Sequence, residues 1–301
     1  MLRLYYCDHY DMGLPPDHRF PARKYRLLRE ALTGDRRFAL HPAPLASREE
    51  VCRAHDPEYV RQFLAGELPP AAVRRIGFPW SPALVVRTLA SVGGALAATE
   101  AAQESGCGGA LMGGTHHAYR AEGSGFCVFN DIAVSIADLR RRGWGSRVAV
   151  VDLDVHQGDG TAALFAEDPD VLTLSFHGRN NFPFRKQTST IDVDFADGTG
   201  DEEYLAALDE YLPRVWEFRP DFVFYQSGVD GLREDKLGKL ALTHAGLAER
   251  DRRVMTAAHG YGKPFVLLLG GGYAEPIEAT VRANANTYRT AGAVWGGPGD
   301  D

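Results

Sequence analysis

Cysteine is scarce in this sequence, and its few copies are not spaced as a structural bridge or a thiolate metal site would require. The chain of 301 residues holds four, at Cys7, Cys52, Cys107 and Cys127, with no CxxC pair. The sequence therefore indicates neither a disulfide framework nor a cysteine zinc knuckle, and it fits a reducing compartment. We expect a cytoplasmic protein.

Targeting, membrane and nucleic-acid signals are lacking as well. The N-terminus MLRLYYCDHYD becomes charged too early for a signal peptide, and no unbroken apolar run approaches the roughly 18 residues that span a bilayer. Basic residues are dispersed and the net charge is −7. These features argue against membrane insertion and direct nucleic-acid binding, whereas a cationic peptide would meet no general repulsion.

Two common enzyme signatures are also missing. No serine lies in a G-x-S-x-G elbow, so a serine hydrolase is not supported. The triple glycine at 270–272 lacks the GxGxxG spacing of a dinucleotide-binding loop.

Short apolar runs alternate with longer amphipathic stretches, and this alternation predicts the fold. Because most of the runs are continuously apolar, we predict an α/β protein with a mostly parallel sheet covered by helices on both faces. We assign residues 1–295 to one domain and 296–301 to a frayed tail. The predicted strands are Leu2–Tyr6, Gly109–Met112, Arg147–Leu153, Val171–Phe176, Phe222–Gln226 and Phe265–Leu269. The predicted helices are Ala22–Leu32, Pro57–Ala65, Pro82–Glu104, Asp131–Arg142, Glu202–Phe218, His244–Ala258 and Pro276–Thr290.

The stretch VVDLDVHQGDGT, residues 150–161, places acids directly after a buried strand. An unpaired buried carboxylate costs several kcal/mol, so these acids need partners. On an extended segment Asp154 and His156 point the same way and can share a metal, with Asp230 as a third ligand from another strand end. Three protein ligands plus water is the catalytic arrangement of zinc, although Fe²⁺ or Mn²⁺ binds similar ligands. The alternative is that these are loop acids that cap helices.

Two further features fit chemistry at the same edge of the sheet. The adjacent histidines His116 and His117 are typical of a general-base and general-acid pair, with Asp152 and Asp159 as carboxylate partners that fix their tautomers. The phenol of Tyr273, after the triple glycine, can donate to a developing oxyanion. The alternatives are a surface His-His dipeptide and an ordinary capping tyrosine.

Several blocks of the sequence resemble the histone deacetylase superfamily, which includes acetylpolyamine amidohydrolases and acetoin-utilisation proteins. They are GGTHHAYRAEGSGFCVFND, VVDLDVHQGDGT, SGVD, DKLG and LGGGY, and their order and approximate spacing agree from about residue 1 to 290. The segments HRFPARKYRLLRE and RRIGFPWSP are similar to the class IV-like branch and its bacterial relatives. The resemblance implies the three-layer arginase–deacetylase fold and one catalytic zinc per chain.

Matched residue by residue, the resemblance implies a role for each candidate. Asp154, His156 and Asp230 would bind the zinc, and Tyr273 would hydrogen-bond the substrate carbonyl. The other implied sites are the histidine pair His116 and His117 with Asp152 and Asp159, and a tunnel for the acyl-lysine stem lined by Gly125, Phe126 and Phe182. The family also binds K⁺ or Na⁺, here through Asp152, Asp154, His156, Ser175 and Phe176 at an inner site and Phe165, Asp168 and Val171 at an outer one. Arg26 matches either an arginine that lines an internal cavity or a surface position.

The activity implied is zinc-dependent hydrolysis of an acetyl- or acyl-lysine amide in a peptide or protein, or of a related small acetylated amine. His117 would carry the proton and Tyr273 would stabilise the oxyanion. A binuclear manganese ureohydrolase is one alternative, but it needs extra bridging acids, and Leu232 stands two residues after Asp230. A non-catalytic binder of acylated ligands is another, although it predicts the loss of a key residue and all are present. Gly231-Leu232 and Asp235-Lys236 replace the family's usual Pro-His and Asp-Pro, which affects the rim loop.

Overall fold

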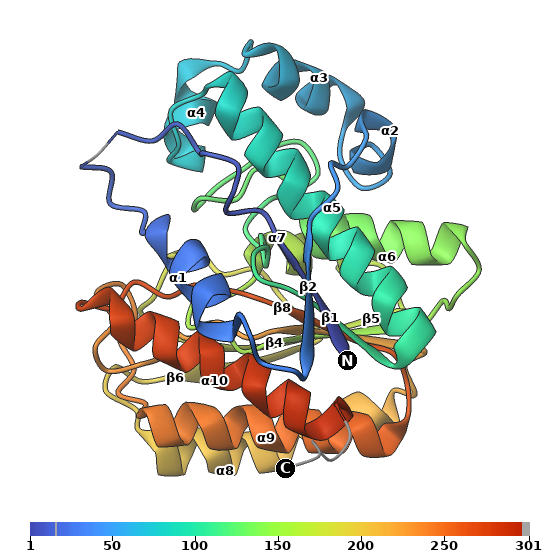
Figure 1. The fold of residues 1–301 in the computed structure, drawn as a ribbon, viewed down its shortest axis with the longest axis vertical. Coiled ribbons are helices and arrows are strands. Elements are labelled where there is room, and N and C mark those ends of the chain that lie inside the picture. The colour runs from blue at the N-terminus through green and yellow to red at the C-terminus, as the bar shows by residue number, and fades with distance from the viewer. Residues whose placement is uncertain (16, 297–301) are drawn as a thin grey trace.

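One parallel sheet runs through the protein (Figure 1). The computed structural model describes residues 1–15 and 17–296, and within these ranges the sheet has eight strands. They are β1 (Leu2–Tyr6), β2 (Phe38–Pro42), β3 (Cys107–Ala110), β4 (Val148–Asp152), β5 (Val171–Gly178), β6 (Ile191–Phe195), β7 (Phe222–Gln226) and β8 (Phe265–Leu268). Their order across the sheet is β2-β1-β3-β8-β7-β4-β5-β6, and every neighbouring pair is parallel.

Helices cover both faces of the sheet, which makes three layers (Figure 1). In the described part of the chain they are α1 (Arg23–Leu32), α2 (Arg48–Val51), α3 (Pro57–Ala65), α4 (Pro70–Ile76), α5 (Pro82–Ser105), α6 (Asp131–Arg141), α7 (Asp159–Phe165), α8 (Asp201–Glu217), α9 (His244–Tyr261) and α10 (Ile277–Trp295). Buried side chains of α1, α8, α9 and α10 pack on one face of the sheet, and those of α5 and α6 pack on the other.

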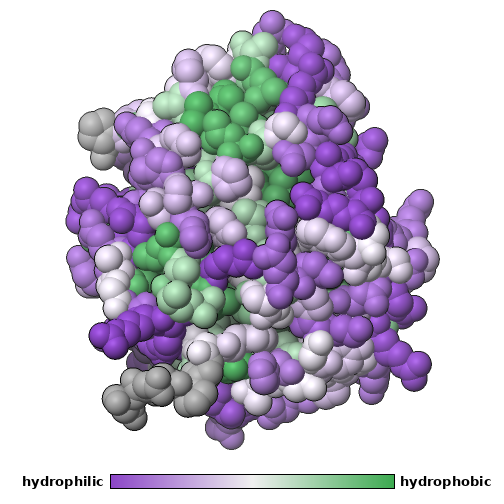
Figure 2. Space-filling model, turned by 45° about the vertical axis from the view of Figure 1, so that its right-hand side comes forward, coloured by the Kyte–Doolittle hydropathy of each residue, from purple (hydrophilic) through white to green (hydrophobic). Residues whose placement is uncertain are grey.

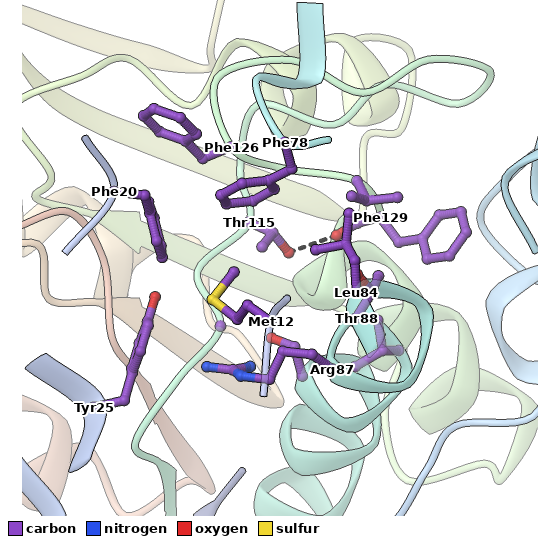
Figure 3. Close-up of a pocket in the computed structure, with 14 residues that line it drawn as sticks. Met12, Phe20, Tyr25, Phe78, Leu84, Arg87, Thr88, Thr115, Phe126 and Phe129 are labelled. Carbon is purple, nitrogen blue, oxygen red and sulfur yellow. Dashed lines mark hydrogen bonds between the residues drawn. The ribbon is translucent and has the colours of Figure 1, made fainter. Parts of the chain in front are cut away.

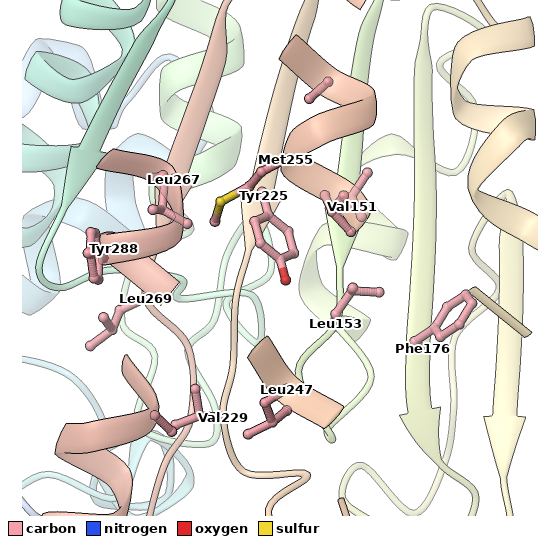
Figure 4. Packing of buried hydrophobic residues seen from close by; sticks show 14 of the residues in the cluster. Val151, Leu153, Phe176, Tyr225, Val229, Leu247, Met255, Leu267, Leu269 and Tyr288 are labelled. Carbon is pink, nitrogen blue, oxygen red and sulfur yellow. The ribbon is translucent and has the colours of Figure 1, made fainter. Parts of the chain in front are cut away.

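The buried strands divide their side chains between these two faces. In β4, Ala149 and Val151 belong to the core under α8–α10, whereas Val148 and Val150 belong to the core under α5 and α6. Figure 4 shows the first of these cores, where Val151, Tyr225 and Leu267 lie opposite Met255 of α9. Because successive side chains of a strand point to opposite faces, a strand covered on both sides must be apolar throughout. This is the pattern from which the strands were predicted.

The six interior strands were predicted, and the two edge strands were not. The edge strands are β2, with the sequence FALHP, which becomes exposed toward its end, and β6, with the sequence IDVDF, which alternates in exposure. Strand β3 begins at Cys107, two residues before the predicted start. The seven predicted helices are present with ends shifted by at most five residues, while the short helices α2, α4 and α7 were not predicted.

A third group of side chains packs at the end of the molecule formed by α2 to α5. In Figure 2, hydrophobic residues gather in the upper part of the molecule, which is the end formed by α2 to α5. Much of the rest of that face is hydrophilic. Helix α5 is long and apolar enough to cross a membrane by length and composition, although polar residues such as Arg87 and Thr99 interrupt its apolar stretches. However, 56% of that stretch is buried inside the protein, and α5 packs against β3 and α6, as a core helix does.

The predicted frayed tail begins at Gly296, which ends α10 with its N–H bonded to the Gly292 carbonyl. Residues 297–301 of that tail lie outside the described residues. All eight strands of the described chain lie in one sheet, and the assignment of residues 1–295 to one domain stays a prediction.

Candidate active site

Three potential metal ligands meet at the carboxyl edge of the sheet. Asp154 and His156 follow β4, Asp230 follows the neighbouring strand β7, and their ligand atoms all lie within 4.8 Å of one another. His156 Nδ1 lies 3.1 Å from Asp154 Oδ1 and 3.0 Å from Asp230 Oδ2. Both carboxylates are buried, so they need a cation between them. The structure thus brings together the three residues predicted as ligands.

The backbone holds both carboxylates in place. The Gly271 N–H donates to Asp154 Oδ2 at 2.6 Å, and the Val155 N–H donates to Asp230 Oδ1 at 3.0 Å. A Cβ at Gly271 would overlap the Asp230 carboxylate, so the triple glycine is needed for this close approach.

The protonation of His156 shows what the site would bind. Burial opposes a charge on His156, but its hydrogen bonds to the Asp154 and Asp230 carboxylates raise its pKa to about 10. The two acids therefore favour a positive charge between them. Two carboxylate oxygens and one imidazole nitrogen form an open donor set that fits a divalent metal such as zinc.

Both histidines of the pair have the carboxylate partners that the sequence suggested. His116 Nδ1 lies 2.7 Å from Asp152 Oδ2, and His117 Nδ1 lies 2.6 Å from Asp159 Oδ1. The hydroxyl of Tyr119 donates to the other oxygen of Asp159 at 2.8 Å. The Nε2 atom of His116 lies 4.0 Å from Asp154 Oδ1, so this ring points toward the metal-ligand cluster.

The two adjacent histidines differ in charge because their surroundings differ. Burial opposes the charge of His116, but the Asp152 and Asp154 carboxylates outweigh it and raise the pKa to about 9. Burial and the charge of His116 lower the pKa of His117 to about 4 despite its bond to Asp159. The surroundings thus favour the charged form of His116 and the neutral form of His117.

Tyr273 and the predicted tunnel residues line cavities that reach this cluster. Gly125, Phe126 and Tyr273 line both the cavity over the ligands and a wider rim cavity, and Phe182 lines the rim cavity. A Cβ at Gly125 would lie 2.7 Å from the His117 ring, so only glycine fits there. Phe126 adopts a φ of 66°, which is rare for a bulky residue and typical of functional sites. Burial raises the pKa of the Tyr273 phenol well above its usual value, which keeps it a proton donor.

The sequence reading missed three buried residues that support the site. Asp131 accepts hydrogen bonds from the N–H groups of Gly114 and Thr115 and so fixes the loop before His116. It lies in the FND of a quoted block, and the only signal was its place at the predicted start of a helix.

Arg250 and Lys24 are the other two. Arg250 of α9 donates to the carbonyls of Leu153 and Gly228, so it joins the loops that carry the metal ligands. Lys24 of α1 donates to the carbonyls of Gly270 and Gly272, each at 3.3 Å, beside Tyr273. Both look like ordinary surface charges in the sequence.

Arg26 does not line an internal cavity. Its side chain is 59% exposed and pairs with Glu30 on the same helix, so the surface alternative is the correct one. Lys24, Arg87 and Arg250 are buried lysine and arginine side chains near the site.

The residues proposed for monovalent cations fall in two places. Ser175 is the register partner of Asp152 in the β4–β5 ladder, and Phe176 follows it in the same strand, beside the ligand loop. Phe165, Asp168 and Val171 lie together where α7 leads into β5, and the Asp168 N–H bonds to the Phe165 carbonyl at 3.0 Å. The two predicted sites stay predictions.

Comparisons with known proteins give the class. A model of the histone deacetylase domain matches residues 18–289, so the chain belongs to that family. An uncharacterised protein of Picosynechococcus sp. is 41% identical over 294 residues, which cover 96% of this chain and 98% of that protein. A probable deacetylase of Archaeoglobus fulgidus is 33% identical, over 82% of this chain and 73% of its own.

A solved structure confirms the fold. The acetylpolyamine aminohydrolase from Burkholderia pseudomallei matches 98% of this chain and 99% of its own with a TM-score of 0.78 and 22% identity. The predicted three-layer arginase–deacetylase fold is therefore confirmed, and the chain is a hydrolase of the deacetylase family.

Proposed function

We propose that this protein is a zinc-dependent deacylase of the cytoplasm that hydrolyses the amide of acetyl-lysine, or of another acyl-lysine, in a peptide or protein. One observation carries the proposal: the Asp154–His156–Asp230 cluster lies beside two histidine–aspartate pairs, and Tyr273 lines the same cavity. In the described residues this is the only such ligand cluster. Asp152 is engaged by His116, which leaves it unavailable to bridge a second metal as a ureohydrolase would need.

The chain's own residues have distinct tasks in this proposal. A divalent metal at the cluster supplies a Lewis acid for the acyl carbonyl and for water. Neutral His117, whose Nδ1 is held by Asp159, accepts the proton of water at Nε2 and later gives it to the leaving amine. His116, held by Asp152, assists electrostatically beside the reacting carbonyl, and the Tyr273 phenol donates to the forming oxyanion.

The charge at the rim favours a peptide over a polyamine. The rim cavity is lined by three cationic residues, Arg19, Arg75 and Lys239, and by no carboxylate among the described residues. Arg75 pairs with Glu122, and Lys239 lies 3.9 Å from Asp197, which leaves Arg19, over the Phe126 ring, as the rim cation without an ion-pair partner in the described residues. A polyamine carries several ammonium groups and would be repelled here, whereas a lysine stem leading to a neutral or acidic peptide would not.

Parallel hydrolysis assays test this proposal. We expect the protein to release acetate from an acetyl-lysine peptide with a higher kcat/KM than from acetylspermidine. Tyr273→Phe should lower that kcat/KM by roughly 10²–10³-fold, because one oxyanion donor is lost. Tyr261→Phe, at the end of α9 away from the site, is the matched control and should leave the rate unchanged. Undiminished hydrolysis by Tyr273→Phe, or no hydrolysis of any acyl-lysine peptide, would contradict the proposal.

A further inference from the structure

A second cavity adjoins the cavity over the metal ligands, and it holds an unpaired cation. The two cavities share Phe20, Tyr25, Gly113, Thr115 and Phe126 as lining residues. The second one, called the inner cavity here, is otherwise lined mostly by apolar side chains, and Arg87 of α5 points into it (Figure 3). The remaining residues that line it are Met12, Phe78, Leu84, Thr88, Ser91, Val92, Val128 and Phe129.

Arg87 lacks the partner that a buried guanidinium needs. It is 5% exposed, and within residues 1–15 and 17–296 it makes no hydrogen bond or ion pair. Its nearest compensation is the ring of Tyr25, whose centroid lies 4.7 Å from the guanidinium carbon. No carboxylate of the described chain lines the cavity. Because arginine stays protonated, the inner cavity holds a permanent positive charge with free donors.

The position of this charge indicates which part of a substrate it would meet. The rim cavity reaches His117, His156 and Tyr273 and is open to the amine side of a substrate. The inner cavity adjoins the cavity over the metal ligands at Gly113 and Thr115, which precede the histidine pair in the sequence. Phe126 is the one lining residue that the inner cavity and the rim cavity have in common. An acyl group whose carbonyl lies at the metal site, with its lysine stem in the rim cavity, would extend into the inner cavity.

We propose that Arg87 binds a carboxylate at the far end of the acyl chain, so that the substrates are carboxyacyl-lysines of the succinyl or glutaryl type. A planar guanidinium accepts a carboxylate through two parallel hydrogen bonds, and the apolar walls suit the methylene groups between. This inference rests on the proposed deacylase function. In the reaction water adds to the acyl carbon, the C–N bond breaks, the amine takes a proton, and the acyl group leaves as a dicarboxylate.

Pairs of peptides that differ only in the terminal group test the inference. Succinyl-lysine is compared with butanoyl-lysine, and glutaryl-lysine with pentanoyl-lysine, by kcat/KM, with acetyl-lysine as the common reference. We expect the carboxylated member to be the better substrate in at least one pair. Arg87→Gln should lower that carboxylated-to-uncharged ratio by about tenfold or more, because a charge-assisted hydrogen-bond pair is lost. Arg26→Gln, an exposed arginine of α1, is the control and should leave the ratio unchanged.

Two readouts keep the test decisive if the Arg87 variant does not fold. The wild-type pair ratios need no variant, and free glutarate should inhibit wild-type hydrolysis at lower concentration than free pentanoate. Better turnover of the uncharged member in both pairs would overturn the inference. An equal effect of Arg87→Gln on the hydrolysis of all acyl groups would also overturn it, because Arg87 would then bind the released carboxylate product. Deacetylation without any carboxylate preference overturns this inference alone. Failure on every acyl-lysine peptide overturns the proposed function.

Discussion

The carboxyl edge of the sheet and the body of the sheet below it bury different kinds of groups, although the same strands run through both. In β4, Val148 to Val151 are buried among apolar side chains, and the next positions, Asp152 and Asp154, are buried as acids. Burial of apolar surface stabilises the body without directional partners. At the edge, each buried charge is tolerated because a specific partner compensates it.

The comparison separates stability from chemistry. At the edge, burial and all the neighbouring charges together set the charge of a group: Asp152 and Asp154 outweigh burial and raise the pKa of His116, whereas burial and the charge of His116 lower the pKa of His117. In the body of the sheet, packing determines the stability of the fold and has no direct effect on the chemistry. A substitution at the edge should therefore change reactivity more than stability, and a substitution in the body should do the reverse.

Loss of His117 should have the largest effect at the edge. Because this imidazole is the proposed proton carrier, His117→Ala should lower kcat/KM on acetyl-lysine peptide by roughly 10²–10⁴-fold. Metal content, measured by elemental analysis, should stay that of the wild type, because His117 is not in the ligand cluster. Undiminished activity of His117→Ala, or loss of its metal, would contradict the role assigned to His117.

Loss of Phe265 should have the opposite profile. This residue lies at the amino end of β8, fully buried, with its ring 5.0 Å from Trp295. Phe265→Ala should lower the free energy of unfolding in urea by about 3–5 kcal/mol, because the core loses contacts and gains a cavity. The kcat of the folded fraction should stay at the wild-type value. A large fall in that kcat with little change in unfolding would show that the two regions are not separable.

Arg250 should affect both properties, since it lies at the border. It donates to the Leu153 and Gly228 carbonyls beside the ligand loops and pairs with buried Asp251. Arg250→Met should cost about 3 kcal/mol of unfolding free energy, because it leaves a buried carboxylate without its cation, and should also lower kcat/KM. Arg252→Met is the matched control: this exposed neighbour pairs with Glu249 and should change stability by less than about 1 kcal/mol. Equal changes in unfolding free energy and kcat/KM in the two variants would contradict the role assigned to Arg250.

The pH dependence of stability tests the comparison at His55, a buried histidine without a carboxylate partner. Burial lowers the pKa of His55 to about 4, although its ring nitrogens bond to the backbone of Arg120 and Asn130. The folded pKa is lower than the unfolded value of about 6.5, so the unfolded chain binds the extra proton. Stability contributed by neutral His55 is complete above pH 6.5 and is lost, up to about 3 kcal/mol, as the pH falls toward 4.

Urea unfolding at several pH values measures this effect. His55→Gln should flatten the fall in stability between pH 6.5 and 4 relative to the wild type. An unchanged slope in the variant would mean that other groups cause the acid sensitivity.

The same contrast explains which strands the sequence could predict. The central strands β3, β8, β7, β4 and β5 are buried at every position, as in FVFYQ of β7, whereas β1, next to the edge strand β2, alternates in burial. The edge strands β2 and β6 have one neighbour each, so IDVDF carries two aspartates and alternates in exposure. Such segments have the composition of loops, and only pairing with β1 or β5 makes them strands.

The site could be predicted where residue type and strand position carried the information. His, Asp and Tyr after buried strands indicated the ligand cluster, the two histidine–aspartate pairs and Tyr273. Arg250 and Asp251 could not be found in this way, because ERDRRV has the composition of a solvated helix face, yet both side chains are 1% exposed while Arg252 is 58% exposed. Which charges turn inward is decided by how α9 packs, and the same is true of Arg87 in α5.

Metal titration against activity tests the central claim most directly. The protein is treated with a chelator, dialysed, and given increasing Zn²⁺ while hydrolysis of an acetyl-lysine peptide is measured. We predict that hydrolysis is lost on metal removal and returns to a plateau at one metal ion per chain, because one ligand cluster is available in the described structure. Hydrolysis that survives complete metal removal, or a plateau only at two ions per chain, would contradict the account.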